Sequence, residues 1–165
     1  MSQYFGKYRG SVLDNVDPMR MGRIQVKVPD ISPSPSWAMP CVPFAGPECG
    51  DFAVPPVGAH VWVEYERGDP GQPIWSGCFW GSAAEVPALG PAALPAQTIV
   101  LQTAGQHVLA IRDLPGPAGG IMLKTATGAM ISISDTGIVI ANGKGATITL
   151  IGPAVDVNEG ALSVV

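Results

Sequence analysis

The sequence has little charge, little cysteine and no long apolar run, and each shortage excludes a class of protein. Charged residues make up 13% of the 165 positions, about half of the ~25% found in an average soluble domain. Hydrophobic residues reach 47%. Disordered chains combine low hydrophobicity with high charge, so this chain falls outside that class. It must fold or assemble to cover its apolar surface.

The cysteines are too few and odd in number for a disulfide framework: Cys41, Cys49 and Cys78. We expect reduced, partly buried thiols and no metal site, because His60 is too far away in sequence to complete a ligand set. No window approaches the ~20 apolar residues of a membrane helix. The polar start MSQYFGKYRG lacks the features of a secretory signal. These observations predict assembly in the cytoplasm.

The net charge of −4 and the pI near 4.9 argue against general nucleic-acid binding, which needs a basic surface. Patterns typical of catalysis are also weak. Glu64 and Glu66 share one strand face, but such a pair is more typical of a solvated or partner-facing edge than of an acid/base site. We therefore expect no catalytic, cofactor-binding or metal-ligating residues, and a protein that is not an enzyme.

Turn-forming and β-branched residues are abundant, with 21 Gly and 17 Pro, and together they predict an all-β fold. In Ile24–Val28, apolar residues alternate with polar ones, as in half-buried strands. In the segment 59–66, Val61, Val63 and Tyr65 share one strand face, and the residues between them face the other way. About five strands precede Ser82 without a helical period. Residues 1–82 are therefore predicted to form a small OB-fold barrel.

Two proline-rich segments interrupt the strand patterns. Pro33, Pro35 and Pro40 predict an ordered loop after the second strand. Residues 83–97, AAEVPALGPAALPAQ, carry one charge and no alternation. They are predicted to form an extended, semi-rigid connector.

The second half, residues 98–165, contains short strand-like segments about eight residues apart, each followed by a turn with glycine. Each segment offers one apolar face and is too short to enclose a core. A single chain would expose this face and its strand edges. We expect three chains to wind around one axis, with strands pairing between chains, although a small monomeric meander would also fit the composition. The predicted trimer core is Ile131, Ile133, Ile138, Ile140, Ile148, Leu150, Val155 and Val157.

Three stretches of the sequence together resemble one known family. YRGSVLDNVDPMRMGRIQVKVPDI and GDPGQPIWSGCFW are similar to the OB module of phage baseplate assembly protein V and related spike proteins. LQTAGQHVLAIRDLPG and the ending VDVNEGALSVV resemble the trimeric β-helix or β-prism of the same family. The resemblance implies an N-terminal OB barrel followed by an intertwined triple-stranded β-helix or β-prism in a homotrimer. It covers nearly the whole chain.

The same resemblance implies a function and partners. Such proteins form the central spike of a phage virion baseplate or of an extracellular contractile injection particle. The barrel would bind the baseplate hub or tube protein, and a small conical tip protein would bind the C-terminus. The predicted tip contact is Ala161, Leu162, Ser163, Val164 and Val165.

Two properties of some relatives are not expected here. Only a short connector stands where a lysozyme domain would lie, and His60 and His107 are too far apart to form the His-x-His pair of an iron-binding tip. The alternative function is an OB-fold nucleic-acid-binding module with a β-rich oligomerisation tail. Aromatic side chains on an OB surface can stack on bases, although the acidic chain does not favour this.

Overall fold

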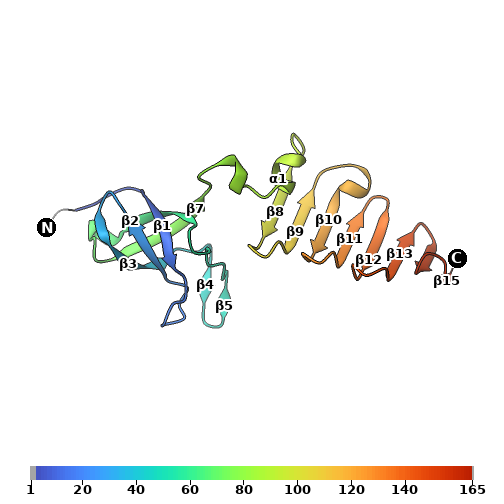
Figure 1. The fold of residues 1–165 in the computed structure, drawn as a ribbon, viewed down its shortest axis with the longest axis horizontal. Helices are drawn as coiled ribbons and strands as arrows, with labels where there is room; N and C mark the ends of the chain where they lie inside the picture. The colour runs from blue at the N-terminus through green and yellow to red at the C-terminus, as the bar shows by residue number, and fades with distance from the viewer. Residues whose placement is uncertain (1–2, 165) are drawn as a thin grey trace. The chain divides into compact units, whose positions relative to one another are not determined.

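The computed structural model describes residues 3–164, and the chain divides into two compact units, residues 1–85 and residues 86–165. Both units consist almost entirely of β-strands (Figure 1). The predicted all-β fold with an N-terminal barrel is confirmed.

The first unit is a closed five-stranded barrel in the order β1-β2-β3-β7-β6. All neighbours are antiparallel except β3 and β7, which are parallel. A short hairpin, β4 (Ala45–Gly46) and β5 (Cys49–Gly50), extends from the loop between β3 and β6. The barrel strands are β1 (Tyr8–Asp14), β2 (Ile24–Val28), β3 (Ser32–Pro40), β6 (His60–Tyr65) and β7 (Pro73–Phe79).

The apolar positions that alternate along the predicted strands are the ones buried in the barrel core. Ile24, Val26 and Val28 are buried. In β6, Val61 and Val63 are fully buried while the residues between them face outward. Because side chains alternate across a strand, one face of each strand fills the barrel and the other meets solvent. The core is completed by a further set of residues: Val12, Ala38, Tyr65 and Trp75.

The proline-rich stretch after β2 is a strand, where the sequence favoured a loop. β3 pairs with β2 from Ser32 to Ala38, but it meets β7 only at Met39 and Pro40. The first part of β3 therefore has a partner on one side only. Proline is tolerated in such a strand because its missing N–H can face the unpaired edge.

The segment between the two units contains helical turns, where the sequence predicted an extended connector. A 3₁₀ turn, η2, covers Ala83–Glu85, and one turn of helix, α1, covers Leu89–Ala92. Ala93 at the end of α1 is buried. Prolines are compatible with the first turn of a helix, so their presence did not enforce an extended chain.

The second unit is an eight-stranded antiparallel meander in which each strand pairs with its sequence neighbours. The strand pairing is thus within one chain, where the sequence analysis expected strands of three chains to pair with each other. A 3₁₀ turn, η3 (Gly116–Ala118), precedes β10. The strands are β8 (Thr98–Gln102), β9 (Val108–Arg112), β10 (Gly120–Lys124), β11 (Met130–Ser134), β12 (Gly137–Ala141), β13 (Thr147–Ile151), β14 (Ala154–Val157) and β15 (Leu162–Val164).

Two glycines begin strands of the meander for a steric reason. Gly120 has φ +78, and a Cβ there would collide with the carbonyl oxygen of Ile133 on the neighbouring strand. Gly137 has φ +149, and a Cβ would meet the carbonyl oxygen of Leu150. Only glycine permits both this backbone conformation and this close approach.

Candidate assembly surfaces

Aliphatic side chains form two parallel rows across the whole meander. Cross-strand partners on one face are aliphatic at every strand pair from β8 to β15. The first row contains Ile99, Ile111, Ile121, Ile133, Ile138, Leu150 and Val155. The second row contains Leu101, Leu109, Leu123, Ile131, Ile140, Ile148, Val157 and Leu162.

This two-row face is largely open to solvent in the single chain. Leu101 is 63% exposed, Ile99 53% and Ile133 44%. Covering the rest of such a side chain stabilises a protein by roughly 1–2 kcal/mol, at about 25 cal/mol per Å². An apolar face of this extent is typical of an interface.

All predicted trimer-core residues lie in these two rows. Ile131, Ile133, Ile140 and Ile148 are exposed, and the other four predicted positions are half-buried. Their burial between chains stays a prediction. The first three strands add residues to the rows that were not among the predicted core, although apolar alternation in 98–102 and 108–112 could have revealed them: Ile99, Leu101, Leu109, Ile111, Ile121 and Leu123.

The opposite face of the meander is smaller and more polar. Its central cross-strand row includes Ala110, Ser132, Thr149 and Asp156. Ala110 is fully buried, and α1 packs beside β8. The same central row also contains Val100, Met122 and Val139, but polar residues interrupt it, whereas both rows of the other face are aliphatic at every strand from β8 to β14. The two-row face is therefore the one better suited to association.

The predicted tip-contact residues lie at one edge of the sheet. β15 is the last strand of the order, so it has a neighbour, β14, on one side only. Leu162 is 59% exposed. Ala161 precedes the strand, Ser163 and Val164 belong to it, and Val165 lies outside the described residues. An edge strand with exposed apolar side chains is a template for a partner.

Aromatic and basic side chains cluster on the outside of the barrel. The Arg9 guanidinium lies 5.6 Å from the Trp62 ring centre and 5.3 Å from that of Phe79. His60 stacks on Phe79 with ring centres 5.2 Å apart. Arg9 and His60 thus cover aromatic surface that a base would need for stacking.

The two carboxylates considered for catalysis do not share a strand face. Glu64 lies on β6 and forms an ion pair with Lys7 at 2.8 Å, whereas Glu66 begins the 3₁₀ turn η1 (Glu66–Gly68) that follows the strand. Among residues 3–164, no group of three or more His, Cys, Asp or Glu side chains could hold a metal ion. No helix in the described part of the chain is both long and apolar enough to cross a membrane.

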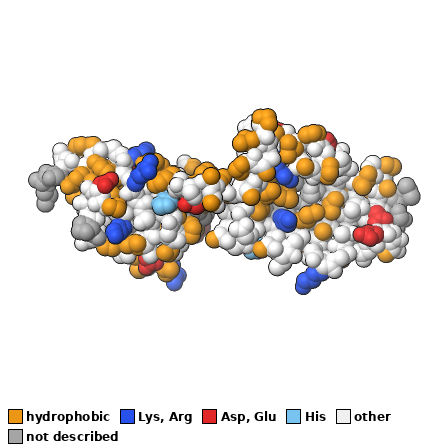
Figure 2. Space-filling view, turned by 45° about the horizontal axis from the view of Figure 1, so that its top comes forward, with side chains coloured by type: hydrophobic (Ala, Val, Ile, Leu, Met, Phe, Trp, Pro, Cys, Tyr) orange, Lys and Arg blue, Asp and Glu red, His pale blue; other side chains and the backbone are white. Residues whose placement is uncertain are grey.

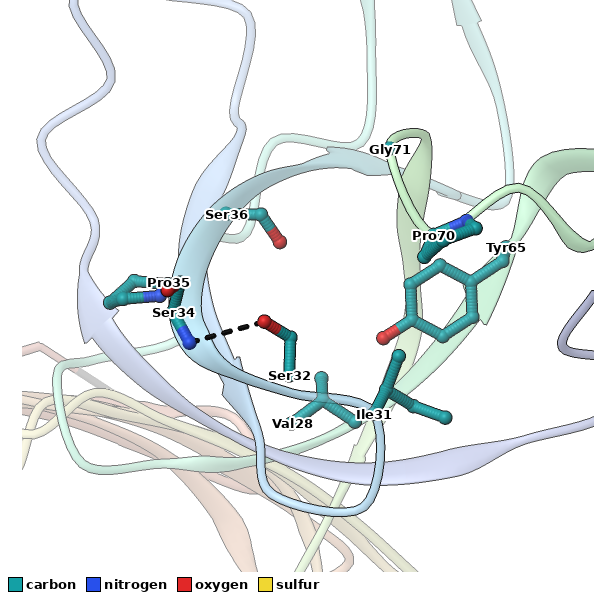
Figure 3. A pocket seen from close by; sticks show the side chains of 9 residues that line it. All are labelled: Val28, Ile31, Ser32, Ser34, Pro35, Ser36, Tyr65, Pro70 and Gly71. Atoms are coloured by element: carbon teal, nitrogen blue, oxygen red, sulfur yellow. Dashed lines mark hydrogen bonds between the residues drawn. The ribbon is translucent and has the colours of Figure 1, made fainter. Parts of the chain in front are cut away.

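One end of the barrel carries a half-open pocket of about 300 Å³. Figure 3 shows the hydroxyl groups of Ser32, Ser36 and Tyr65 pointing toward its centre. The backbone N–H of Ser34 donates to Ser32 Oγ at 3.1 Å. Burial, with the nearby Tyr8 and Tyr4, raises the pKa of the Tyr65 hydroxyl, and the protonated hydroxyl can donate a hydrogen bond into the pocket.

The other end of the barrel carries a larger groove of about 480 Å³. It lies between the 15–23 loop, the β4–β5 hairpin and the side of the barrel. Trp75 forms part of its wall, and its indole Nε1–H donates to the carbonyl of Gly22 at 3.2 Å. Phe52, also in the wall, is 76% exposed.

The cysteines are unpaired and exposed, where the sequence analysis expected partly buried thiols. Cys49 lies on β5 at the rim of the groove. Although the Cys78 residue is exposed by surface area, neighbouring atoms partly shield its thiol from water, and this desolvation raises the thiol pKa, so less of its reactive thiolate is present at neutral pH. Hydrophobic side chains are scattered over both units in the view of Figure 2.

Comparison with known proteins agrees with this arrangement of a barrel and a sheet. Residues 8–80 match the type VI secretion system/phage-baseplate injector OB domain. Residues 98–163 match the phage baseplate V C-terminal trimerisation domain. The type VI secretion system spike protein VgrG4b of Pseudomonas aeruginosa is 39% identical over 59 residues, which is 36% of this chain but only 7% of that relative. The chain belongs to the phage baseplate V family of spike proteins and carries both its OB domain and its trimerisation domain.

Proposed function

We propose that the protein is the central spike of a contractile tail or injection particle, assembled as a homotrimer and acting without catalysis. The exposed two-row aliphatic face carries this proposal. Three such faces turned toward one axis would form a dry core, and each chain would contribute one side of a prism. The trimerisation domain that matches residues 98–163 supports the same stoichiometry.

The structure of the sheet suits a mechanical role. Eight strands at ~4.8 Å spacing give a needle of roughly 35 Å. Within each chain, backbone hydrogen bonds join every strand to the next. Pulling one strand away would break both these bonds and the aliphatic core, so the rod resists local rupture as it punctures an envelope.

Partners are proposed for both ends of the spike. The Ser32, Ser36 and Tyr65 hydroxyls lie at the end of the barrel opposite to the one at which β7 ends and the chain leaves the barrel. We assign the hub or tube protein to this end. The β15 edge, with Leu162 exposed, is assigned to a small conical tip protein. The mature protein would therefore reside in a phage baseplate or an extracellular injection particle, after assembly in the cytoplasm.

Mass by light scattering tests the proposed homotrimer. Three chains of 17.0 kDa give about 51 kDa. Dissociation and unfolding of the C-terminal unit should coincide, since its apolar face has no cover in a monomer. A stable, folded monomer at micromolar concentration would contradict the proposal.

Nucleic-acid binding is the alternative function. The Trp62 and Phe79 rings are the surface that would have to stack bases, and Arg9 already lies over both. A salt-dependent shift in the electrophoretic mobility of a labelled oligonucleotide, seen at physiological ionic strength, would favour the alternative. No shift is expected from a chain with a net charge of −4.

A further inference from the structure

The barrel end with the groove is also the end at which the chain leaves the barrel. β1, β3 and β7 end there, and β2 and β6 begin there, as their pairing directions require. Both long loops, 15–23 and 41–59, are therefore at this end, and the chain leaves it at Trp80. The opposite end carries short turns, such as the one at Asp30.

Large apolar side chains are strongly exposed at this exit end. Phe52 and Val16 are each 76% exposed, and Met19, Phe44 and Trp80 are each 61% exposed. They come from both loops and from Trp80, the residue that follows β7. Single surface hydrophobics need no explanation, but several large ones at the same end of a barrel, beside a groove, are typical of a protein interface. Aromatic and methionine side chains are also the types enriched in such interfaces.

The charges on this end are complementary to one another but not paired within the chain. Arg20 lies on the 15–23 loop, whereas Glu48 and Asp51 lie on and beside the hairpin, and all three line the groove. Among the described residues, the ion pairs are Lys7 with Glu64 and Arg23 with Asp17. A surface with an unpaired cation on one loop and unpaired carboxylates on another can pair with a second copy of itself.

We propose that this exit end is an interface between barrels of the same spike. The groove of each barrel would be occupied by residues of the loops 15–23 and 41–59 of the next copy. The inference rests on the proposed homotrimer. A head-to-tail contact repeated around a threefold axis closes into a ring, so each copy gives one loop end and receives another. The expected contacts join Arg20 of one copy to Glu48 or Asp51 of its neighbour, around an apolar centre that includes Phe44 and Phe52.

The connector explains why a second copy is the occupant. Residues 81–97 tether the exit end of each barrel to the shared trimerisation domain. Short tethers give local concentrations in the millimolar range, so a contact too weak for free barrels would form within the trimer. The opposite end of the barrel points away from this tether and stays available to a different partner.

Thiol labelling of Cys49 tests the interface in the full-length protein. In a variant with Cys41→Ser and Cys78→Ser, Cys49 is the remaining thiol, and a small maleimide reports its accessibility. The matched control carries Asp30→Cys in a cysteine-free background, which places one exposed thiol at the opposite end of the barrel. Light scattering on each sample first establishes whether the protein is a trimer.

In the trimer, Cys49 should react with the maleimide at least about tenfold more slowly than the Asp30→Cys thiol. This factor is expected if Cys49 reacts only while the interface is open and the interface is closed more than roughly nine-tenths of the time. Adding Phe44→Asp should restore the control rate while the mass stays that of a trimer. Equal rates for both thiols in an intact trimer would overturn this inference and leave the proposed function standing. Protection that survives Phe44→Asp, or that appears only after a hub protein is added, would also overturn it. A monomeric protein would overturn both.

Discussion

Asp17 and Arg23 form a paired contact that fixes the 15–23 loop. The Arg23 guanidinium donates to Asp17 Oδ1 from Nε at 3.0 Å and from Nη2 at 2.7 Å. The Asp17 carboxylate also accepts hydrogen bonds from the backbone N–H groups of Met19, Met21 and Arg23. Arg23 in turn lies 5.5 Å from the Trp37 ring centre. One carboxylate thus shapes the loop that carries Arg20 and Met21 to the groove.

Replacing this carboxylate should destabilise the barrel in a pH-dependent way. The Arg23 hydrogen bonds hold the pKa of Asp17 well below its usual range. A lowered folded-state pKa stabilises the protein above the unfolded value of ~3.9, and this contribution is lost as pH falls toward the folded pKa. Asp17→Asn should lower the thermal midpoint at pH 7, and the difference from wild type should shrink below about pH 4.

Asp30→Asn is the control for this comparison, because Asp30 is exposed in a turn at the opposite end of the barrel. It should leave the midpoint nearly unchanged at pH 7. A difference between Asp17→Asn and wild type that stays constant down to pH 2 would show that the carboxylate charge does not stabilise the loop.

A charge in the two-row face should abolish the trimer. Ile140 is 43% exposed and lies in the second row between Ile131 and Ile148. Threefold symmetry would bring three Asp side chains together in a dry core, where each unpaired charge costs several kcal/mol. Ile140→Asp should therefore give monomers or aggregates by light scattering.

Ser132→Asp is the matched control, since Ser132 lies on the opposite face of the same sheet. The trimer should tolerate it. If Ser132→Asp dissociated the trimer and Ile140→Asp did not, the sheet would face the axis with its polar side, and the proposed core would be reversed.

The alternation of apolar and polar residues was the sequence pattern that predicted the structure well. It placed Val61 and Val63 in the barrel and grouped Ile131 with Ile140, because side-chain direction in a strand follows residue parity. It could not give strand partners, since within-chain and between-chain pairing bury the same face. The β4–β5 hairpin escaped notice because its four residues are exposed and lack any apolar period.

A glycine substitution tests the register of the meander. Gly120→Ala places a Cβ against the carbonyl of Ile133 in a left-handed backbone conformation, and it should destabilise the trimer by more than ~1 kcal/mol. Gly90→Ala is the control, because Gly90 lies in α1 with open space around it. Alanine there should be neutral or stabilising by up to about 1 kcal/mol. Equal unfolding midpoints for the two variants would contradict this strand register.

Removing the C-terminal unit should weaken contacts between barrels. A fragment ending before Ile99 keeps every residue of the barrel core but loses the two-row face. At micromolar concentration we expect a soluble barrel that is monomeric or loosely associated, because the tether that raises its local concentration is gone. Trimerisation of this fragment as tight as that of the full chain, measured by sedimentation, would show that the barrel itself drives assembly.

Deleting residues 161–165 should block binding of the tip protein and spare the trimer. The deletion removes β15, and β14 becomes the edge of a seven-strand sheet. The two aliphatic rows still cross the strands from β8 to β14, so most of the proposed core remains. What is lost is the exposed Leu162 side chain and the unpaired edge of β15, which in a trimer would form a small threefold platform. A charged extension after residue 165 keeps these groups and should block the tip protein by covering the platform. Co-purification of the tip protein with the deleted spike at undiminished yield, with the trimer verified by light scattering, would place the tip contact elsewhere.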